Sequence, residues 1–233
     1  FIQPVVIDPL YNHFYPLKDQ ALENKILTLA DKAHIPADHV YEVNMSEKTN
    51  TMNAYVTGIG ENKRIVLWDT TLQKLKDREI LFIMAHEMGH YVMKHVYIGL
   101  AGYLVLSLAG FFAIDRLYFY FYRKGAVLFR LREPRDIAAL PLLLMIVSVL
   151  SFTASPFTNA VSRHQERAAD EYAINLTKDG EAGVTSFQKL AKSGLSQVNP
   201  PLLVKVFRYG HPTMMERIME MEAAEKEETS KKQ

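Results

Sequence analysis

Two long uncharged segments constrain the fold of this chain more than any other feature of its sequence. Residues 96–114 (VYIGLAGYLVLSLAGFFAI) and residues 137–162 (IAALPLLLMIVSVLSFTASPFTNAVS) contain no Asp, Glu, Lys or Arg. About twenty apolar residues suffice for a helix to cross the hydrocarbon core of a lipid bilayer. We therefore predict a transmembrane hairpin of two helices, in preference to a pair of buried core helices.

The segment between them, residues 115–136, holds six basic and three acidic residues. Cytoplasmic loops of membrane proteins carry an excess of positive charge, so this count places the loop in the cytoplasm and the rest of the chain across the membrane. Residues 118–122 (YFYFY) resemble the belt of aromatic side chains found where a helix leaves the bilayer.

The composition excludes several kinds of site and partner. The 233 residues include no cysteine, which excludes disulfides, iron–sulfur clusters, thiolate zinc sites and cysteine nucleophiles. Lysine plus arginine (27) nearly balances aspartate plus glutamate (26), so we expect no nucleic-acid partner. The chain starts at Phe1 without a basic-then-apolar leader, and we expect it to be a piece of a longer protein.

Shorter patterns outside the apolar segments predict an α+β fold that is mainly helical with a small antiparallel sheet. Alternating runs predict strands at residues 40–45, 54–57 and 64–68, the last two forming a hairpin. Periodic patterns and capping residues predict helices at residues 22–34, from residue 77 towards the first apolar segment, at 162–178, at 184–192 and from residue 213. Residues 220–233 are so dense in charge that we expect a disordered tail.

One short motif within residues 79–95 (EILFIMAHEMGHYVMKH) has the spacing of a metal site. On a helix, His86 and His90 lie four residues apart on the same face, so both imidazoles can bind a single ion. Glu87 lies about 100° around the helix from His86, where it can reach a water at the metal without binding the metal. The motif predicts a zinc site with a general base.

Two histidines do not complete a zinc site, so a third ligand must come from elsewhere in the chain. Met93 and Val96 stand where a metzincin requires glycine and histidine, which excludes that class. His95 is out of register, and we interpret it as a helix-terminal or surface residue. Glu166 and Asp170 share a face of a predicted helix, where one carboxylate could complete a His₂Glu site and the other could hold a ligand imidazole. The same pattern describes an ordinary salt-bridged helix, and for Glu166 taken alone we would prefer that interpretation.

The motif belongs to a longer ordered set, by which the chain resembles the C-terminal catalytic part of the type I CAAX prenyl proteases, integral-membrane zinc metallopeptidases. The matching pieces extend over nearly the whole chain and are residues 9–17 (PLYNHFYPL), 53–55 (NAY), 65–72 (IVLWDTTL) and 86–90 (HEMGH), Ser162-Arg163 with Glu166 and Ala169-Asp170, and 210–212 (GHP) followed by Arg217.

This resemblance implies a zincin-like metalloprotease domain with one Zn²⁺ per chain, and roles for particular residues. It implies His86, His90 and Glu166 as metal ligands and Glu87 as the catalytic base of a gluzincin-type endopeptidase. The remaining implied roles are an edge strand that pairs with the substrate backbone at Asn53, Ala54 and Tyr55, an oxyanion-stabilising His211, and a structural Arg217 that pairs with Asp170.

The resemblance also implies the order of the parts along the chain. Residues 1–95 would form the N-terminal half of the catalytic domain and residues 96–162 the membrane hairpin with its basic loop. Residues 163–219 would form the C-terminal half with the third zinc ligand, followed by the disordered tail at 220–233.

The implied function is zinc-dependent removal of C-terminal residues from peptides or proteins prenylated at a C-terminal cysteine. The resemblance implies a catalytic part that faces the cytoplasm, and we prefer this to the opposite orientation given by the loop charges. The composition and the lack of an organelle signal favour the bacterial inner membrane. A sister group of membrane proteases acts in protein quality control without a prenyl requirement, and residues 12–17 (NHFYPL) favour the prenyl-protease branch. A non-catalytic adaptor whose zinc staples the two sides of the hairpin together is a third hypothesis, against which the intact Glu87 argues.

Overall fold

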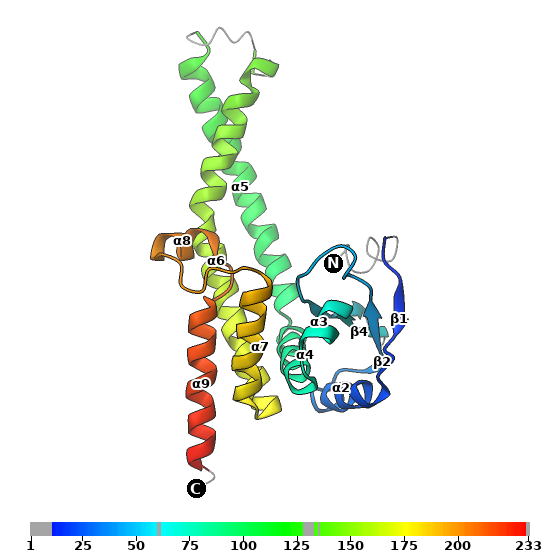
Figure 1. Ribbon diagram of the computed structural model, residues 1–233. Helices are drawn as coiled ribbons and strands as arrows, with labels where there is room; N and C mark the ends of the chain where they lie inside the picture. The colour runs from blue at the N-terminus through cyan, green and yellow to red at the C-terminus, as the bar shows by residue number, and fades with distance from the viewer. Residues whose placement is uncertain (1–10, 60–61, 128–132, 135, 232–233) are drawn as a thin grey trace.

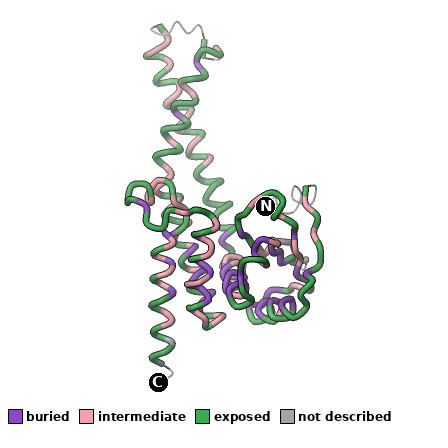
Figure 2. Tube along the Cα trace, in the orientation of Figure 1, coloured by how far each residue is buried: buried purple, intermediate pink, exposed green. Residues whose placement is uncertain are grey.

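The computed structural model describes residues 11–59, 62–127, 133–134 and 136–231, and a long helical hairpin projects from the rest of these residues (Figure 1). The hairpin consists of α5 (His95–Gly125) and α6 (Leu140–Thr177), which follows the short 3-10 helix η2 (Ile137–Ala139). Both are long and apolar enough to cross a membrane, and the most apolar windows of the two spans are 0% and 11% buried (Figure 2). Within the described residues these helices are therefore not buried core helices.

The two hairpin helices extend beyond the segments that predicted them. Helix α5 continues through the aromatic residues 118–122 to Gly125, so helix replaces much of the predicted loop at 115–136. Helix α6 runs without interruption from the apolar segment to Thr177, although Pro156 lies inside it. Proline removes one helical hydrogen bond, yet it is tolerated in membrane-type helices when neighbouring groups compensate. A single helix therefore carries both the second apolar segment and the predicted third ligand.

A four-stranded sheet lies on one side of the part of the chain outside the hairpin. Its strands are β1 (Phe14–Pro16), β2 (Ala37–Val43), β3 (Ala54–Ile59) and β4 (Asn62–Trp68), in the order β1-β2-β4-β3. The β1–β2 and β3–β4 pairs are antiparallel, but β2 runs parallel to β4. The sheet is therefore mixed, and the prediction of a purely antiparallel sheet is wrong. The chain passes from β2 to the far side of β4 before it turns back, which leaves β3 at an edge.

One helix lies between the first two strands, and two more connect the sheet to the hairpin. Helix α2 (Gln20–Lys32) begins where Asp19 accepts a hydrogen bond from the Leu22 N–H, and it buries its apolar face against the sheet. The short α3 (Asp69–Lys74) leads to α4 (Asp77–Val92), whose first turn is closed by Glu79, which accepts a hydrogen bond from the Lys76 N–H. Most of α4 is buried, so the helix that carries the histidine motif is part of the hydrophobic core.

The C-terminal part of the chain forms α7 (Gly180–Ser193), α8 (Leu202–Arg208) and α9 (Met214–Lys231). Helix α8 was not predicted, and the predicted disordered tail at 220–233 is helical as far as residue 231. The tail is ordered because it packs on α7: Met221 is buried, and Glu225 accepts a hydrogen bond from the Gly180 N–H. Gly180 permits this close crossing, since a Cβ there would lie 2.9 Å from the Met221 carbonyl oxygen.

Candidate active site

Helix α4 places two histidines and a glutamate at one cavity. His86 and His90 lie one turn apart, and their Nε2 atoms are 3.2 Å from each other. Glu87, the residue after His86, lines the same cavity. This arrangement follows from the helical repeat, because residues four apart share a face.

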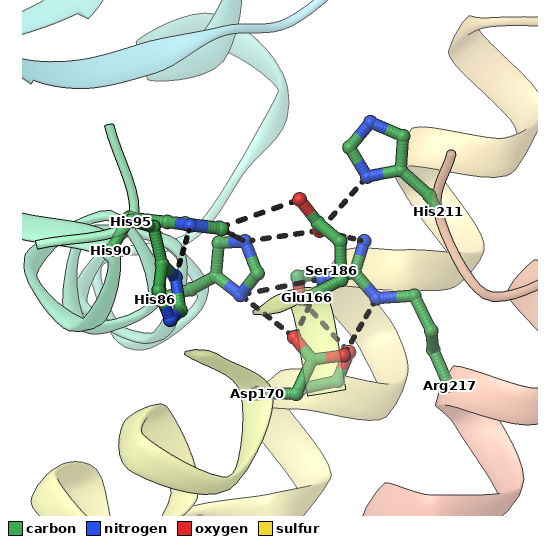
Figure 3. A network of polar contacts seen from close by, with 9 residues as sticks. His86, His90, His95, Glu166, Asp170, Ser186, His211 and Arg217 are labelled. Atoms are coloured by element: carbon green, nitrogen blue, oxygen red, sulfur yellow. Dashed lines mark hydrogen bonds and ion pairs between the residues drawn. The ribbon is translucent and has the colours of Figure 1, made fainter. Parts of the chain in front are cut away.

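Helix α6 brings a carboxylate to the two imidazoles (Figure 3). Oε2 of Glu166 is 3.5 Å from Nε2 of His86, and Oε1 is 3.4 Å from Nε2 of His90. The two helices approach closely at Gly89, where a Cβ would lie 3.3 Å from the Cα of Ala169 on α6 and 3.1 Å from the Tyr172 ring. Gly89 therefore helps to set the distance at which Glu166 faces the histidines.

The three side chains fit a tetrahedral metal ion. Ligand atoms at about 2.0–2.1 Å from zinc, at the corners of a tetrahedron, are separated by about 3.3 Å, which matches the spacings between these atoms. Among the described residues, these three form a group with potential ligand atoms all within 4.8 Å of one another. Oε2 of Glu166 is also buried, and imidazole nitrogens of His86 and His211 lie 3.5 and 2.8 Å from it.

A buried ion pair lies behind the first histidine. Nδ1 of His86 is 2.7 Å from Oδ1 of Asp170, which orients the ring so that its Nε2 faces the candidate metal position. Arg217 on α9 in turn donates to both oxygens of Asp170, at 2.6 and 2.8 Å, and lies over the Phe187 ring at 4.0 Å. The structure thus contains the predicted pair of Arg217 with Asp170.

The second histidine has a partner that the sequence interpretation missed. His95 is at a helix terminus, as one of the two predicted interpretations has it, but it is buried, so the surface interpretation is wrong; its Nδ1 is 2.9 Å from Nδ1 of His90. His95 is the first residue of α5, and Lys94 before it has a left-handed backbone with φ 56°. This turn between α4 and α5 folds His95 back over His90. Nothing in the spacing of the two histidines indicated it.

His211 approaches the site from the loop between α8 and α9. Its Nδ1 lies 2.8 Å from Oε2 of Glu166, while its side chain remains 65% exposed. The loop is held down next to it, because Pro212 and Thr213 are buried and Thr213 bonds to Glu216. An exposed imidazole at this position can reach both the candidate metal position and a bound substrate.

The cavity in front of these groups has a volume of about 260 Å³ and two kinds of wall. One wall is apolar and was not predicted; it consists of Met52, Leu75, Ile83, Phe187 and Leu190. The other includes Asn53 and Ala54 at the start of edge strand β3, whereas Tyr55 is not among the lining residues. Burial raises the pKa of Glu87 in this cavity, which suits a group that must accept a proton.

Along β3, the backbone N–H and C=O groups of successive residues point alternately towards β4 and towards the open edge of the sheet. The Trp68 N–H donates to the Asn53 carbonyl, so residue 53 and every second residue after it direct their backbone groups towards β4. The backbone groups of Ala54 and Val56 therefore point to the open edge. The Ala54 N–H is already bonded to the Asn53 side chain, which leaves the Ala54 carbonyl and both groups of Val56 for an added strand.

Comparison with known proteins identifies the family of this fold and site. A sequence model of Peptidase family M48 matches residues 16–225, so the chain belongs to this family of metallopeptidases. It is 69% identical over 230 residues to the "Uncharacterized metalloprotease YhfN" of Bacillus subtilis, covering 99% of this chain and 53% of that protein. It is 32% identical to a "CAAX prenyl protease 1 homolog" of Arabidopsis thaliana, covering 97% of this chain and 53% of the relative.

A solved structure supports the same assignment. The crystal structure of S. mikatae Ste24p matches with a TM-score of 0.74 and 30% identity, covering 94% of this chain and 53% of that protein. The predicted mainly helical α+β fold with two candidate membrane helices is therefore confirmed, as is the resemblance to the CAAX prenyl proteases. The chain spans about half the length of the curated relatives it matches.

Proposed function

We propose that this chain is the catalytic portion of a zinc-dependent membrane metalloendopeptidase. The observation that supports it most directly is the convergence of His86 and His90 with Glu166, from two different helices, at separations of 3.2–3.5 Å. Glu87 lines the same cavity, so a general base stands beside the ligand set. A purely structural metal site has no use for such a base.

In this proposal His86, His90 and Glu166 would hold the zinc beside the cavity. When bound, zinc supplies a Lewis acid that polarises the scissile carbonyl and lowers the pKa of a water. Glu87 accepts the proton of the attacking water and passes it to the leaving amine. His211, on its exposed loop, donates a hydrogen bond to the developing oxyanion.

Asp170 acts in this scheme by holding His86, and its replacement by asparagine should weaken metal binding. The neutral amide holds the imidazole less firmly in the tautomer that frees Nε2, so we expect affinity for zinc to fall about 10- to 100-fold. Titration against a chelator of known affinity would measure it. Glu171→Gln, at the exposed next position on α6, is the matched control and should bind zinc normally. Unchanged zinc affinity in Asp170→Asn would contradict this role.

The substrate in our proposal is a peptide or protein that adds a strand to the open edge of β3. The backbone groups of Ala54 and Val56 would bind the substrate backbone and carry the scissile bond past Glu87. Asn53, whose backbone is bonded to Thr71, would hold the start of this strand in place. We assign no direct backbone contact to Tyr55, because its backbone faces β4.

We further propose that prenylated CAAX sequences are the substrates, supported by the relatives named as CAAX prenyl proteases. With the chain reconstituted in vesicles, a farnesylated CAAX peptide should be cleaved at least about tenfold faster than the same peptide without farnesyl. Each buried methylene of the lipid is worth about 0.8 kcal/mol, so two already suffice for that factor. Equal rates for both peptides would instead support a quality-control protease without a prenyl requirement.

The arrangement in the membrane is part of the same proposal. Residues 1–95 and 163–219 form the two halves of the catalytic domain, and residues 96–162 form a hairpin that spans the bilayer. The catalytic part faces the cytoplasm of a bacterium, where prenylated or other cytoplasmic C-termini would reach it. The exposed apolar surfaces of α5 and α6 support the membrane placement.

A further inference from the structure

We propose that the segment 193–204, which joins α7 to the start of α8, is an additional membrane contact that inserts into the interface of the bilayer beside α6. Its partner is the acyl-chain region of one lipid leaflet. This inference rests on the membrane hairpin of the proposed function and goes beyond it, because this segment lies outside both candidate spans.

The segment is uncharged and exposes large apolar side chains. Residues 193–204 (SGLSQVNPPLLV) contain no acidic or basic residue and lie between Lys192 and Lys205. The side chains of Leu195, Leu202 and Leu203 are 92%, 72% and 72% exposed. Three leucines this exposed within nine residues are unfavourable in water and favourable in contact with lipid.

The end of α7 holds one of these leucines outward at a conformational cost. The Ser196 N–H donates to the Ala191 carbonyl, which closes α7 with the bond of a Schellman motif. Leu195 occupies the left-handed position of that motif with φ 49°, where glycine is usual. The motif thus holds the Leu195 side chain outward, where it is 92% exposed.

Contacts between α8 and α6 determine how deep the segment 193–204 would lie in the bilayer. Phe207 stacks on Phe152 with ring centroids 4.5 Å apart and an interplanar angle of 12°. Asn159 donates to the Val206 carbonyl at 3.2 Å, and Arg163 donates to the Tyr209 carbonyl at 2.7 Å. Helix α8 therefore lies against the last part of the uncharged segment 137–162, beside α6 at the base of the hairpin (Figure 1).

The exposed apolar surface of α6 extends to the same level along the hairpin as the segment 193–204. Phe157 and Val161 of α6 are 74% and 55% exposed at the level where α8 is bonded, and the first charge on α6 follows at Arg163. A short apolar element at this depth lies where interfacial helices bury their apolar face, about 5–10 Å into the boundary between headgroups and acyl chains. Lipid that surrounds the hairpin would therefore cover Leu202 and Leu203 as well.

Insertion of this segment would also fix the position of the loop beside the active site. Helix α8 ends at Arg208, three residues before His211. Gly210 packs against α6, where a Cβ would lie 3.2 Å from Oγ of Ser162. The bilayer contact would thus fix the start of the loop that presents His211 to the cavity.

The absence of cysteine from the sequence allows a direct test by single-site labelling. Leu203→Cys and Leu195→Cys, each labelled with a fluorophore, would be reconstituted in phosphatidylethanolamine–phosphatidylglycerol vesicles. Quenching would be measured with a lipid that carries a nitroxide near the headgroup end of its acyl chain, and separately with aqueous iodide. Leu104→Cys on α5 is the control within the hairpin, and Glu171→Cys is the exposed control on the catalytic part.

We expect the lipid quencher to act on the Leu203 and Leu195 labels several-fold more strongly than on the Glu171 label, with the reverse order for iodide. Iodide quenching equal to that at Glu171 would overturn the inference. Protection from both quenchers would also overturn it, since a second copy or another protein segment would then cover the surface. If the Leu104 label responds to lipid and the Leu203 label does not, this inference alone fails. If the Leu104 label does not respond, the membrane hairpin of the proposed function fails with it.

Discussion

Glu87→Gln should abolish most peptidase turnover without removing the metal. The amide keeps nearly the same shape and volume in the cavity, but it cannot accept the proton of the attacking water. General-base catalysis typically contributes about 10²- to 10⁴-fold to the rate, and we expect kcat to fall by at least that factor. The measurement pairs peptide cleavage in vesicles with zinc content of the same preparation.

The control is Glu171→Gln, which makes the same chemical change on an exposed surface of α6. It should leave both peptide cleavage and zinc content unchanged. Normal turnover in Glu87→Gln would remove this residue from the mechanism. Loss of zinc together with activity would mean that Glu87 helps to bind the metal, and the proposed division between ligands and base would be wrong.

Glu166→Ala should lose zinc. The substitution removes the carboxylate contributed by α6 and leaves only two imidazoles, which do not complete a zinc site. Removing a residue that only supports a ligand costs about 10- to 100-fold in affinity, so removal of a ligand should cost more than about 100-fold. Zinc per chain, followed by chelator competition, measures the loss.

Glu171→Ala serves as the control, one residue beyond Asp170 on the same helix. Zinc that persists in Glu166→Ala at normal affinity would move the third ligand to His211 or His95, the two other imidazoles at the site. A zinc that stabilises the fold against heat in a chain without any peptidase activity would support the non-catalytic adaptor.

Much of the fold could be predicted because it depends on local patterns. Helices α2 and α4 follow from apolar residues at helical spacing, and the β3–β4 hairpin follows from alternation and turn residues. The parallel pairing of β2 with β4 was not predictable, since no local pattern states which strand lies between two others. The helical tail was missed for a similar reason. Its composition favours disorder, and its order comes from Met221 and Glu225 against α7.

The candidate site also contains some residues that the sequence predicts and others that only the structure places. The spacing of His86 and His90 was enough to expect them on one face, with Glu87 about 100° around the helix, because a helix repeats every 3.6 residues. Glu166 remained ambiguous from its own surroundings and was selected only by resemblance to a family. His95 was dismissed, and the structure places it against His90 through a left-handed turn at Lys94.

The sequence by itself therefore determined the metal-site motif and two membrane-length helices, since both are defined by spacing or length along one continuous segment. Only the tertiary structure brings the distant residues Glu166, Asp170 and His211 together at the candidate site, and only it shows the salt bridge from Arg217 and the apolar lining of the cavity. These depend on how closely separate helices pack, as at Gly89, where a missing side chain lets α6 approach α4. Contacts of this kind depend on the shapes of both packed surfaces, so the sequence of one segment alone does not predict them.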